Sequence, residues 1–165
     1  MGNKVKVYGG IIALALLAVT AQASELSGRI VKIADGDTLT VLDAGNRQHK
    51  IRLAEIDAPE IGHGRNKPGQ PYGQNSRQSL ADMCFERTAT VEVMDTDRYG
   101  RTVGRVTCDG KDANLAQVRA GMAWAYRQYN RRPEITRAEG EAHSAHRGLW
   151  ADSSPIPPWD WRHGM

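Results

Sequence analysis

Three short segments concentrate the charged residues that could do chemistry. They read IADGDT at residues 33–38, IRLAEIDAPE at residues 51–60 and DRYGR at residues 97–101. Each places acidic or basic side chains at a predicted strand end or turn. Taken singly, each has an ordinary structural explanation, because Asp-Gly is common in turns and an Arg beside an Asp is usually a weak surface ion pair.

Taken together, the segments indicate phosphodiester chemistry assisted by a metal ion. Asp37 and Asp57 end two strands that can be neighbours, and carboxylates are the ligands that calcium and magnesium prefer. Without a cation, two facing carboxylates would repel each other and raise each other's pKa. Arg52 and Arg101 carry planar guanidinium groups that match phosphate oxygens. Glu60 could hold or deprotonate an attacking water.

The elements that must position these residues begin with β-structure. Apolar runs between residues 26 and 56, separated by turn signals at 35–36 and 43–46, predict three short strands. The Gly- and Pro-rich segment 61–74 predicts a long loop, and residues 76–84 predict a helix. Residues 88–94 and 101–107 then predict a hairpin around a long turn at 95–100.

Two further helices are predicted in the last third of the chain. Asp112 can cap a short helix that stops at Gly121. A longer helix is predicted from Pro133 to Gly148, with apolar residues at helical spacing. The order of elements predicts an α+β domain, a small closed β-barrel of five strands of the OB type that carries helices. Trp159 and Trp161 in the Pro-rich tail, residues 152–165, are predicted to cap the core.

The N-terminus has the layout of an export signal. Lys4 and Lys6 precede the apolar run 11–19, which ends in Ala21-Gln22-Ala23 and is shorter than the roughly 20 residues that span a membrane. Cleavage after Ala23 would leave one domain, residues 24–165, and the alternative is an uncleaved anchor. Loss of two lysines lowers the formal charge from +3 to +1, so bulk charge does not argue for nucleic acid. We expect a secreted or periplasmic protein that is free of the membrane after cleavage.

The two cysteines, Cys84 and Cys108, should form a disulfide if the chain is exported. The predicted hairpin brings Cys108 opposite residues near Thr88, and Cys84 lies just before that strand. The alternative is a pair of buried free thiols. The sequence has no CxxC motif and no clustered histidines, which argues against a zinc site.

The three charged segments resemble the signature of the staphylococcal nuclease (thermonuclease) family, and the similarity runs from about Gly28 to Trp150. The resemblance implies a five-stranded OB-type barrel with three helices. It also implies calcium-dependent hydrolysis of DNA and RNA, preferably single-stranded, that leaves 3′-phosphate ends. A monomer is expected.

Position by position, the resemblance implies roles for individual residues. It implies that calcium is bound by Asp37, Asp57 and the main-chain carbonyl of Ala58, a position where the best-known member of the family has threonine. Asp35 matches an acid just outside the metal ligands, and Tyr99 a tyrosine near the substrate phosphate. The implied catalytic residues are Arg52, Glu60 and Arg101.

Several assignments stay open at this point. Tyr126 and Tyr129 could stack on a base or simply pack against the domain. The cations of the 61–74 loop could touch substrate or only face solvent. The main rival function is a non-catalytic OB-fold module that binds oligonucleotides or oligosaccharides, and a structural protein of the envelope is a third possibility.

Overall fold

The computed structural model describes residues 24–62, 64 and 68–164. The predicted export signal, residues 1–23, lies outside the described residues. So do His63, Arg65 and Lys67, the cations of the loop. The other predicted elements and all the predicted site residues lie inside the described part.

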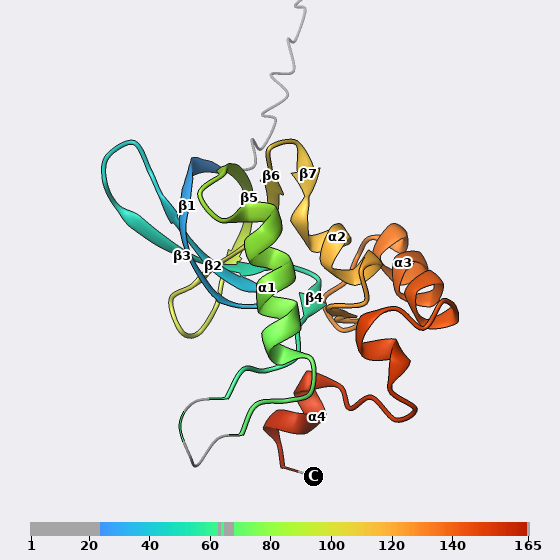
Figure 1. The fold of residues 1–165 in the computed structure, drawn as a ribbon. Coiled ribbons are helices and arrows are strands. Elements are labelled where there is room, and N and C mark those ends of the chain that lie inside the picture. Colours follow the sequence, from blue (N-terminus) through green and yellow to red (C-terminus); the bar gives the residue numbers. More distant parts are fainter. Residues whose placement is uncertain (1–23, 63, 65–67, 165) are drawn as a thin grey trace, which may run out of the picture.

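Five strands form a closed barrel (Figure 1). The sheet order is β3-β2-β1-β5-β6, and a parallel pairing of β3 with β6 closes the barrel, with Arg52 opposite Val103. The other barrel pairings are antiparallel. The predicted five-stranded OB-type barrel is confirmed. Its strands are β1 (Glu25–Asp35), β2 (Thr38–Leu42), β3 (Gln48–Leu53), β5 (Thr88–Thr96) and β6 (Thr102–Cys108).

Three very short strands add to this frame. β7 (Lys111–Asp112) pairs with β6 and extends the sheet. β4 (Ile56–Asp57) pairs with β8 (Trp124–Ala125) outside the barrel. This second pairing fixes Asp57 opposite Trp124, so it joins a predicted metal ligand to the C-terminal half of the chain.

Apolar side chains of alternate strand residues fill the barrel. Ile30, Leu39, Ile51, Val91 and Val106 are completely buried. In β1, β3, β5 and β6 these residues alternate with more exposed ones, because successive side chains of a strand point to opposite faces, whereas in β2 the residues on both sides of Leu39 are also buried. Strand β1 has two register irregularities, the second between Ile33 and Asp35, beside the turn that carries the acidic residues.

The helices lie on one side of the barrel (Figure 1). Asp112 caps α2 as predicted, since its carboxylate accepts a hydrogen bond from the backbone N–H of Leu115 at 2.9 Å. The predicted last helix was too long, because the backbone leaves the helical region at His146, where φ is +50°. The helices are α1 (Gly73–Cys84), α2 (Ala113–Arg119), α3 (Pro133–Ser144), the 3₁₀ helix η1 (Gly148–Ala151) and α4 (Pro158–Arg162).

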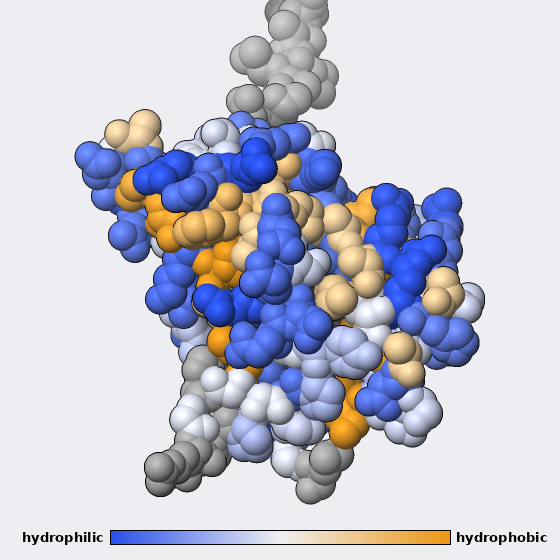
Figure 2. Space-filling model, in the orientation of Figure 1, coloured by the Kyte–Doolittle hydropathy of each residue, from blue (hydrophilic) through white to orange (hydrophobic). Residues whose placement is uncertain are grey.

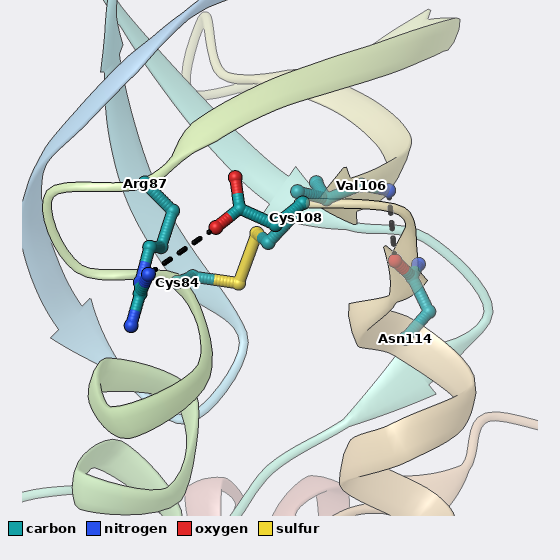
Figure 3. The surroundings of a disulfide bond; sticks show 6 residues. Cys84, Arg87, Val106, Cys108 and Asn114 are labelled. Carbon is teal, nitrogen blue, oxygen red and sulfur yellow. Dashed lines mark hydrogen bonds and ion pairs between the residues drawn. A yellow bond between two sulfur atoms is a disulfide. The ribbon is translucent and has the colours of Figure 1, made fainter.

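The predicted disulfide is present between Cys84 and Cys108 (Figure 3). The two α-carbons are 5.4 Å apart. Cys84 ends α1 and Cys108 ends β6, so the bond ties the first helix to the barrel. Figure 3 also shows the hydrogen bond from the backbone N–H of Val106 to Asn114, which joins α2 to the same strand.

The surface in Figure 2 is mainly hydrophilic, with smaller apolar areas between the polar side chains. In the described part of the chain, no helix has the length and apolar character needed to cross a bilayer.

Candidate active site

The turn between β1 and β2 holds two of the acidic residues. The backbone N–H of Asp37 donates to the Asp35 carboxylate at 3.1 Å. Between them, Gly36 packs so closely on α1 that a Cβ there would lie 1.8 Å from the hydroxyl oxygen of Ser76. The buried Gln117 of α2 donates to the Gly36 carbonyl at 2.7 Å. Two helices therefore fix the position of this acidic turn.

Arg52 lies between the two predicted metal ligands. Its Nη2 is 2.8 Å from Asp57 Oδ1 and 3.2 Å from Asp37 Oδ2. The second of these oxygens also accepts the backbone N–H of Ala58 at 2.7 Å. Only 1% of the Asp57 side chain and 8% of the Asp37 side chain are exposed. The structure thus brings two carboxylates from distant segments onto one cationic nitrogen.

Burial and mutual repulsion dominate the electrostatics of these acids. Burial, with the nearby charge of Asp37, raises the pKa of Asp35 to about 7. Burial also raises the pKa of Asp57, against the lowering effect of two arginines. Burial by itself would lower the pKa of Arg52, but the three surrounding aspartates raise it. The cluster therefore holds more negative charge than its environment accommodates, and an added cation would relieve this repulsion.

Glu60 is held in place through its backbone. Its N–H donates to the side-chain oxygen of Gln70 at 3.1 Å, and its carbonyl accepts the N–H of Gln70 at 2.9 Å. Helix α1 begins so close to this carbonyl that a Cβ on Gly73 would lie 2.3 Å from it. The Glu60 carboxylate is one-third exposed, so it can reach solvent and substrate.

The C-terminal helix also reaches the site. Arg162 of α4 lies 2.6 Å from Asp57 Oδ2 through Nη2, and 2.6 Å from Glu60 Oε1 through Nη1. Through this arginine, the structure brings Glu60 together with the Arg52, Asp37 and Asp57 cluster. The sequence did not predict this contact.

Arg101 and Tyr99 lie on the turn between β5 and β6. The Arg101 guanidinium pairs with Asp97 at 2.7 Å and lies 5.5 Å from the centre of the Tyr99 ring. Tyr99 is 68% exposed. Arg101 directly precedes Thr102, which lies opposite Ile51 in the parallel pairing of β3 with β6. The ion pair with Asp97, however, directs its guanidinium to its own turn.

The two predicted stacking tyrosines pack on each other and on the C-terminal helix. Tyr126 and Tyr129 meet edge to face, with ring centres 4.9 Å apart. Trp159 of α4 lies parallel to the Tyr126 ring at 5.5 Å, and it contacts Trp124 edge to face at 5.8 Å. Tyr129 remains 55% exposed. Trp159 therefore covers Tyr126 rather than simply capping the core.

Comparison with known proteins identifies the family. Residues 50–152 match the family described as "Staphylococcal nuclease homologue". The chain belongs to the staphylococcal nuclease family. A Haemophilus influenzae protein named "Uncharacterized endonuclease" is 44% identical over 134 residues, covering 81% of this chain and 71% of the relative. An Escherichia coli protein of the same name is 42% identical over 141 residues, covering 85% of this chain and 87% of the relative. A Shigella flexneri "Micrococcal nuclease" is 38% identical over 165 residues, covering 92% and 90%.

Two of the residues expected to bind a cation, Asp37 and Asp57, lie together at this nuclease-family site. Within the described residues, no group of three or more His, Cys, Asp or Glu side chains has metal-site geometry. The argument for a cation rests on two buried carboxylates whose oxygens converge on the positive Nη2 of Arg52. The match to the family begins at residue 50, so for Asp37 the argument is this convergence rather than the match.

Three residues at the site were not predicted from the sequence. Gln70 holds Glu60, Gln117 holds the acidic turn, and Arg162 contacts two of the acids. Glutamine and arginine are common on surfaces, and each acts here over a long sequence separation. A weak signal existed only for Arg162, because Pro157-Pro158 is typical of a helix start.

Proposed function

We propose that this protein is an exported, calcium-dependent endonuclease that hydrolyses phosphodiester bonds of DNA and RNA and leaves 3′-phosphate ends. The observation that carries the proposal is the convergence of Asp37 and Asp57 on Arg52, with Glu60 close by, in a member of the staphylococcal nuclease family. Family membership supports the nuclease activity. The metal, the products and the export rest on the residues and on the resemblance.

Asp37, Asp57 and the carbonyl of Ala58 would hold the calcium ion, which would supply positive charge to the phosphoryl oxygens. Arg52 is held beside these ligands by two ion pairs, and it would have to give up part of these contacts to bind a phosphate oxygen. Arg101 would have to exchange Asp97 for the substrate phosphate. Its fork geometry suits either partner.

Glu60 would position the water that attacks phosphorus in line. A carboxylate is a weak base at neutral pH, so proton removal alone explains little acceleration. Most of the rate enhancement should come from charge stabilisation by the arginines and from the fixed position of the water. The Glu60 backbone is held by two hydrogen bonds, one to the Gln70 side chain and one from the Gln70 N–H, which support a fixed position for the water.

The rival hypothesis of a pure binding module is less consistent with the site. A protein that only binds phosphate gains nothing from buried acids beside the backbone track, because these acids repel it. Here three aspartates gather around Arg52, and burial together with repulsion from Asp37 raises the pKa of Asp35. Such an arrangement is useful when a cation is part of the function.

The remaining features of the proposal concern substrate and location. The exposed Tyr129, beside Tyr126, could stack on unpaired bases, which would favour single-stranded substrate. The Cys84–Cys108 disulfide is consistent with an oxidising compartment, either the periplasm or the medium. We propose that the protein acts there as a monomer.

Hydrolysis of denatured DNA and RNA, measured with calcium, with magnesium and with chelator, tests the proposal. We expect turnover with calcium but not with magnesium. A flexible site with few protein ligands suits the high coordination number of calcium better than the strict octahedral geometry of magnesium. Glu60→Gln should lower turnover by about 10²-fold or more, whereas Arg137→Ala, an exposed change on α3, should not alter it. Full activity in chelator, or unchanged turnover in Glu60→Gln, would refute the site.

A further inference from the structure

Helix α4 brings a guanidinium group onto the carboxylates that the proposed nuclease needs free. Arg162 contacts both oxygens of Asp57, Oδ2 at 2.6 Å and Oδ1 at 3.2 Å. The same side chain contacts Glu60 at 2.6 Å. A single residue from the end of the chain thus neutralises a proposed metal ligand and the proposed water-positioning group.

These contacts use the electron pairs that a cation would need. Asp57 is 1% exposed, and Arg52 already donates to its Oδ1 at 2.8 Å. With Arg162 on both oxygens, the carboxylate has two guanidinium partners and no face open to solvent. Calcium binds carboxylate oxygens directly and at short distance. Calcium and Arg162 therefore compete for Asp57.

The same helix covers the proposed base-binding surface. Trp159 lies parallel to Tyr126, with an angle of 4° between the rings. A nucleic-acid base that stacks on an aromatic ring takes this same arrangement. The C-terminal segment, defined here as residues 156–164, therefore blocks one proposed calcium ligand, Asp57, and covers one proposed stacking residue, Tyr126.

Besides the ion pairs of Arg162 and the buried Pro158, one side-chain hydrogen bond and aromatic packing hold the C-terminal segment in place. Gln70 donates through its side chain to the carbonyl of Ile156, and Trp159 packs on Tyr126 and Trp124. Helix α4 has only five residues, too few to be stable without its docking contacts. Figure 1 shows it at the edge of the molecule, below the end of α1, with the C-terminus beside it. Detaching it would leave the barrel and its core intact.

We propose that the C-terminal segment is an autoinhibitory element, in which Arg162 takes the place of the cation on Asp57 and Trp159 covers Tyr126, so that calcium and nucleic acid must displace it. This inference rests on the proposed function. The positive charge of Arg162 is complementary to the acidic site, and the ring of Trp159 is complementary to the stacking surface of Tyr126. A segment with both properties competes with both halves of the substrate complex.

NMR titration of the ¹⁵N-labelled protein with calcium chloride tests this proposal without reference to activity. The backbone N–H of Ala58 donates to Asp37, so its signal reports calcium at the site. The indole N–H signal of Trp159 reports the C-terminal segment. In the wild-type protein, we expect both signals to shift with the same midpoint, because calcium binding and release of the segment are one event.

Two variants should bind calcium more tightly than the wild type. Arg162→Ala removes the competing charge, and Trp159→Ala keeps every charge but removes the docking contact. If the segment is docked about nine-tenths of the time, each variant should lower the apparent dissociation constant by about 10-fold. Arg137→Ala removes one exposed charge from α3 and should leave the affinity unchanged. Arg162→Gln repeats the test if the alanine variant melts at a lower temperature.

Each outcome decides between the hypotheses. Equal affinity in Arg162→Ala and wild type would overturn the autoinhibitory role while leaving the calcium site standing. Tighter binding in Arg162→Ala but not in Trp159→Ala would reduce the effect to charge repulsion and would also overturn it. If Ala58 does not respond to calcium in any variant, the calcium site itself is wrong. Loss of turnover in Arg162→Ala at saturating calcium would make Arg162 a substrate-binding residue instead.

Discussion

Replacing Arg52 by alanine should make the folded protein less stable, so that it unfolds at a lower denaturant concentration. Calcium should restore part of the lost stability. In the structure, one nitrogen of this side chain serves both Asp57 and Asp37. Only 13% of the Arg52 side chain is exposed, and both aspartates are buried. Its removal leaves two buried carboxylates facing each other with one positive partner fewer.

The magnitude follows from this burial. Removing one partner of a buried ion pair typically costs about 3–5 kcal/mol, because the other charge stays buried without compensation. Arg162 remains on Asp57 in the variant, so we expect the lower end, about 3 kcal/mol. Under the proposed function calcium would bind only the folded state, and it should then return up to about 2.7 kcal/mol at one hundred times its dissociation constant.

Urea unfolding with and without calcium measures both effects. Arg47→Ala is the matched control, because Arg47 also pairs with an aspartate, Asp43, but its side chain is 77% exposed. An exposed pair of this kind contributes at most about 1 kcal/mol. We therefore expect a small loss of stability in Arg47→Ala that calcium does not restore.

Two results would refute this reasoning. An Arg52→Ala variant as stable as the wild type would show that the aspartates are not held together by this arginine. A large loss that calcium leaves unchanged would show that the two carboxylates do not form a cation site. Arg52→Lys separates charge from geometry, since lysine keeps the charge without the planar fork, and its turnover should still fall by about 10²- to 10³-fold.

Three more predictions test the surroundings of the site. Asp35 has its pKa raised to about 7, so the folded state binds the extra proton, and stability should fall as pH rises from about 4 to 7. Asp35→Asn should remove that dependence, and in calcium-free buffer at pH 8 it should melt above the wild type. Gln117→Leu leaves the buried carbonyl of Gly36 without its donor, so it should cost about 1–3 kcal/mol and weaken calcium binding in a calorimetric titration. Replacing both Cys84 and Cys108 by alanine should lower the free energy of unfolding in urea by about 3 kcal/mol, because the disulfide, with a sequence separation of 24, restricts the unfolded chain. An unchanged free energy of unfolding would contradict this.

Local signals in the sequence predicted much of the fold. Asp112 was predicted to cap a helix, and it does so, because a capping side chain needs only the next three residues. Asp35-Gly36 was predicted to turn the chain between two strands, and the turn lies between β1 and β2. The predicted last helix ran past its true end at Ser144, because Ala145 and Leu149 continue the apolar spacing although the backbone has already turned.

Long-range contacts could not be predicted in the same way. The sequence placed Arg52 and Arg101 in equivalent roles, whereas the structure buries the first between two aspartates and pairs the second with Asp97. The ion pair of Arg101 with Asp97 is local, because the two residues are only four positions apart in the sequence. The burial of Arg52 depends on β3 closing the barrel against β6 and on β4 turning Asp57 back, and no single segment contains that information.

The position of Arg162 connects the fold to the control of the chemistry. Three aspartates around Arg52 leave an excess of negative charge at the centre of the site, and in this structure the arginine that offsets it comes from the last short helix. A permanent structural cation would be expected on a rigid barrel strand, as Arg52 is. Arg162 instead sits on a five-residue helix near the end of the chain, which is held by the hydrogen bond from Gln70, the packing of Trp159 and Pro158, and the ion pairs of Arg162 itself. This placement agrees with the proposed autoinhibition, in which calcium would replace the charge of Arg162 and the segment that carries it would detach.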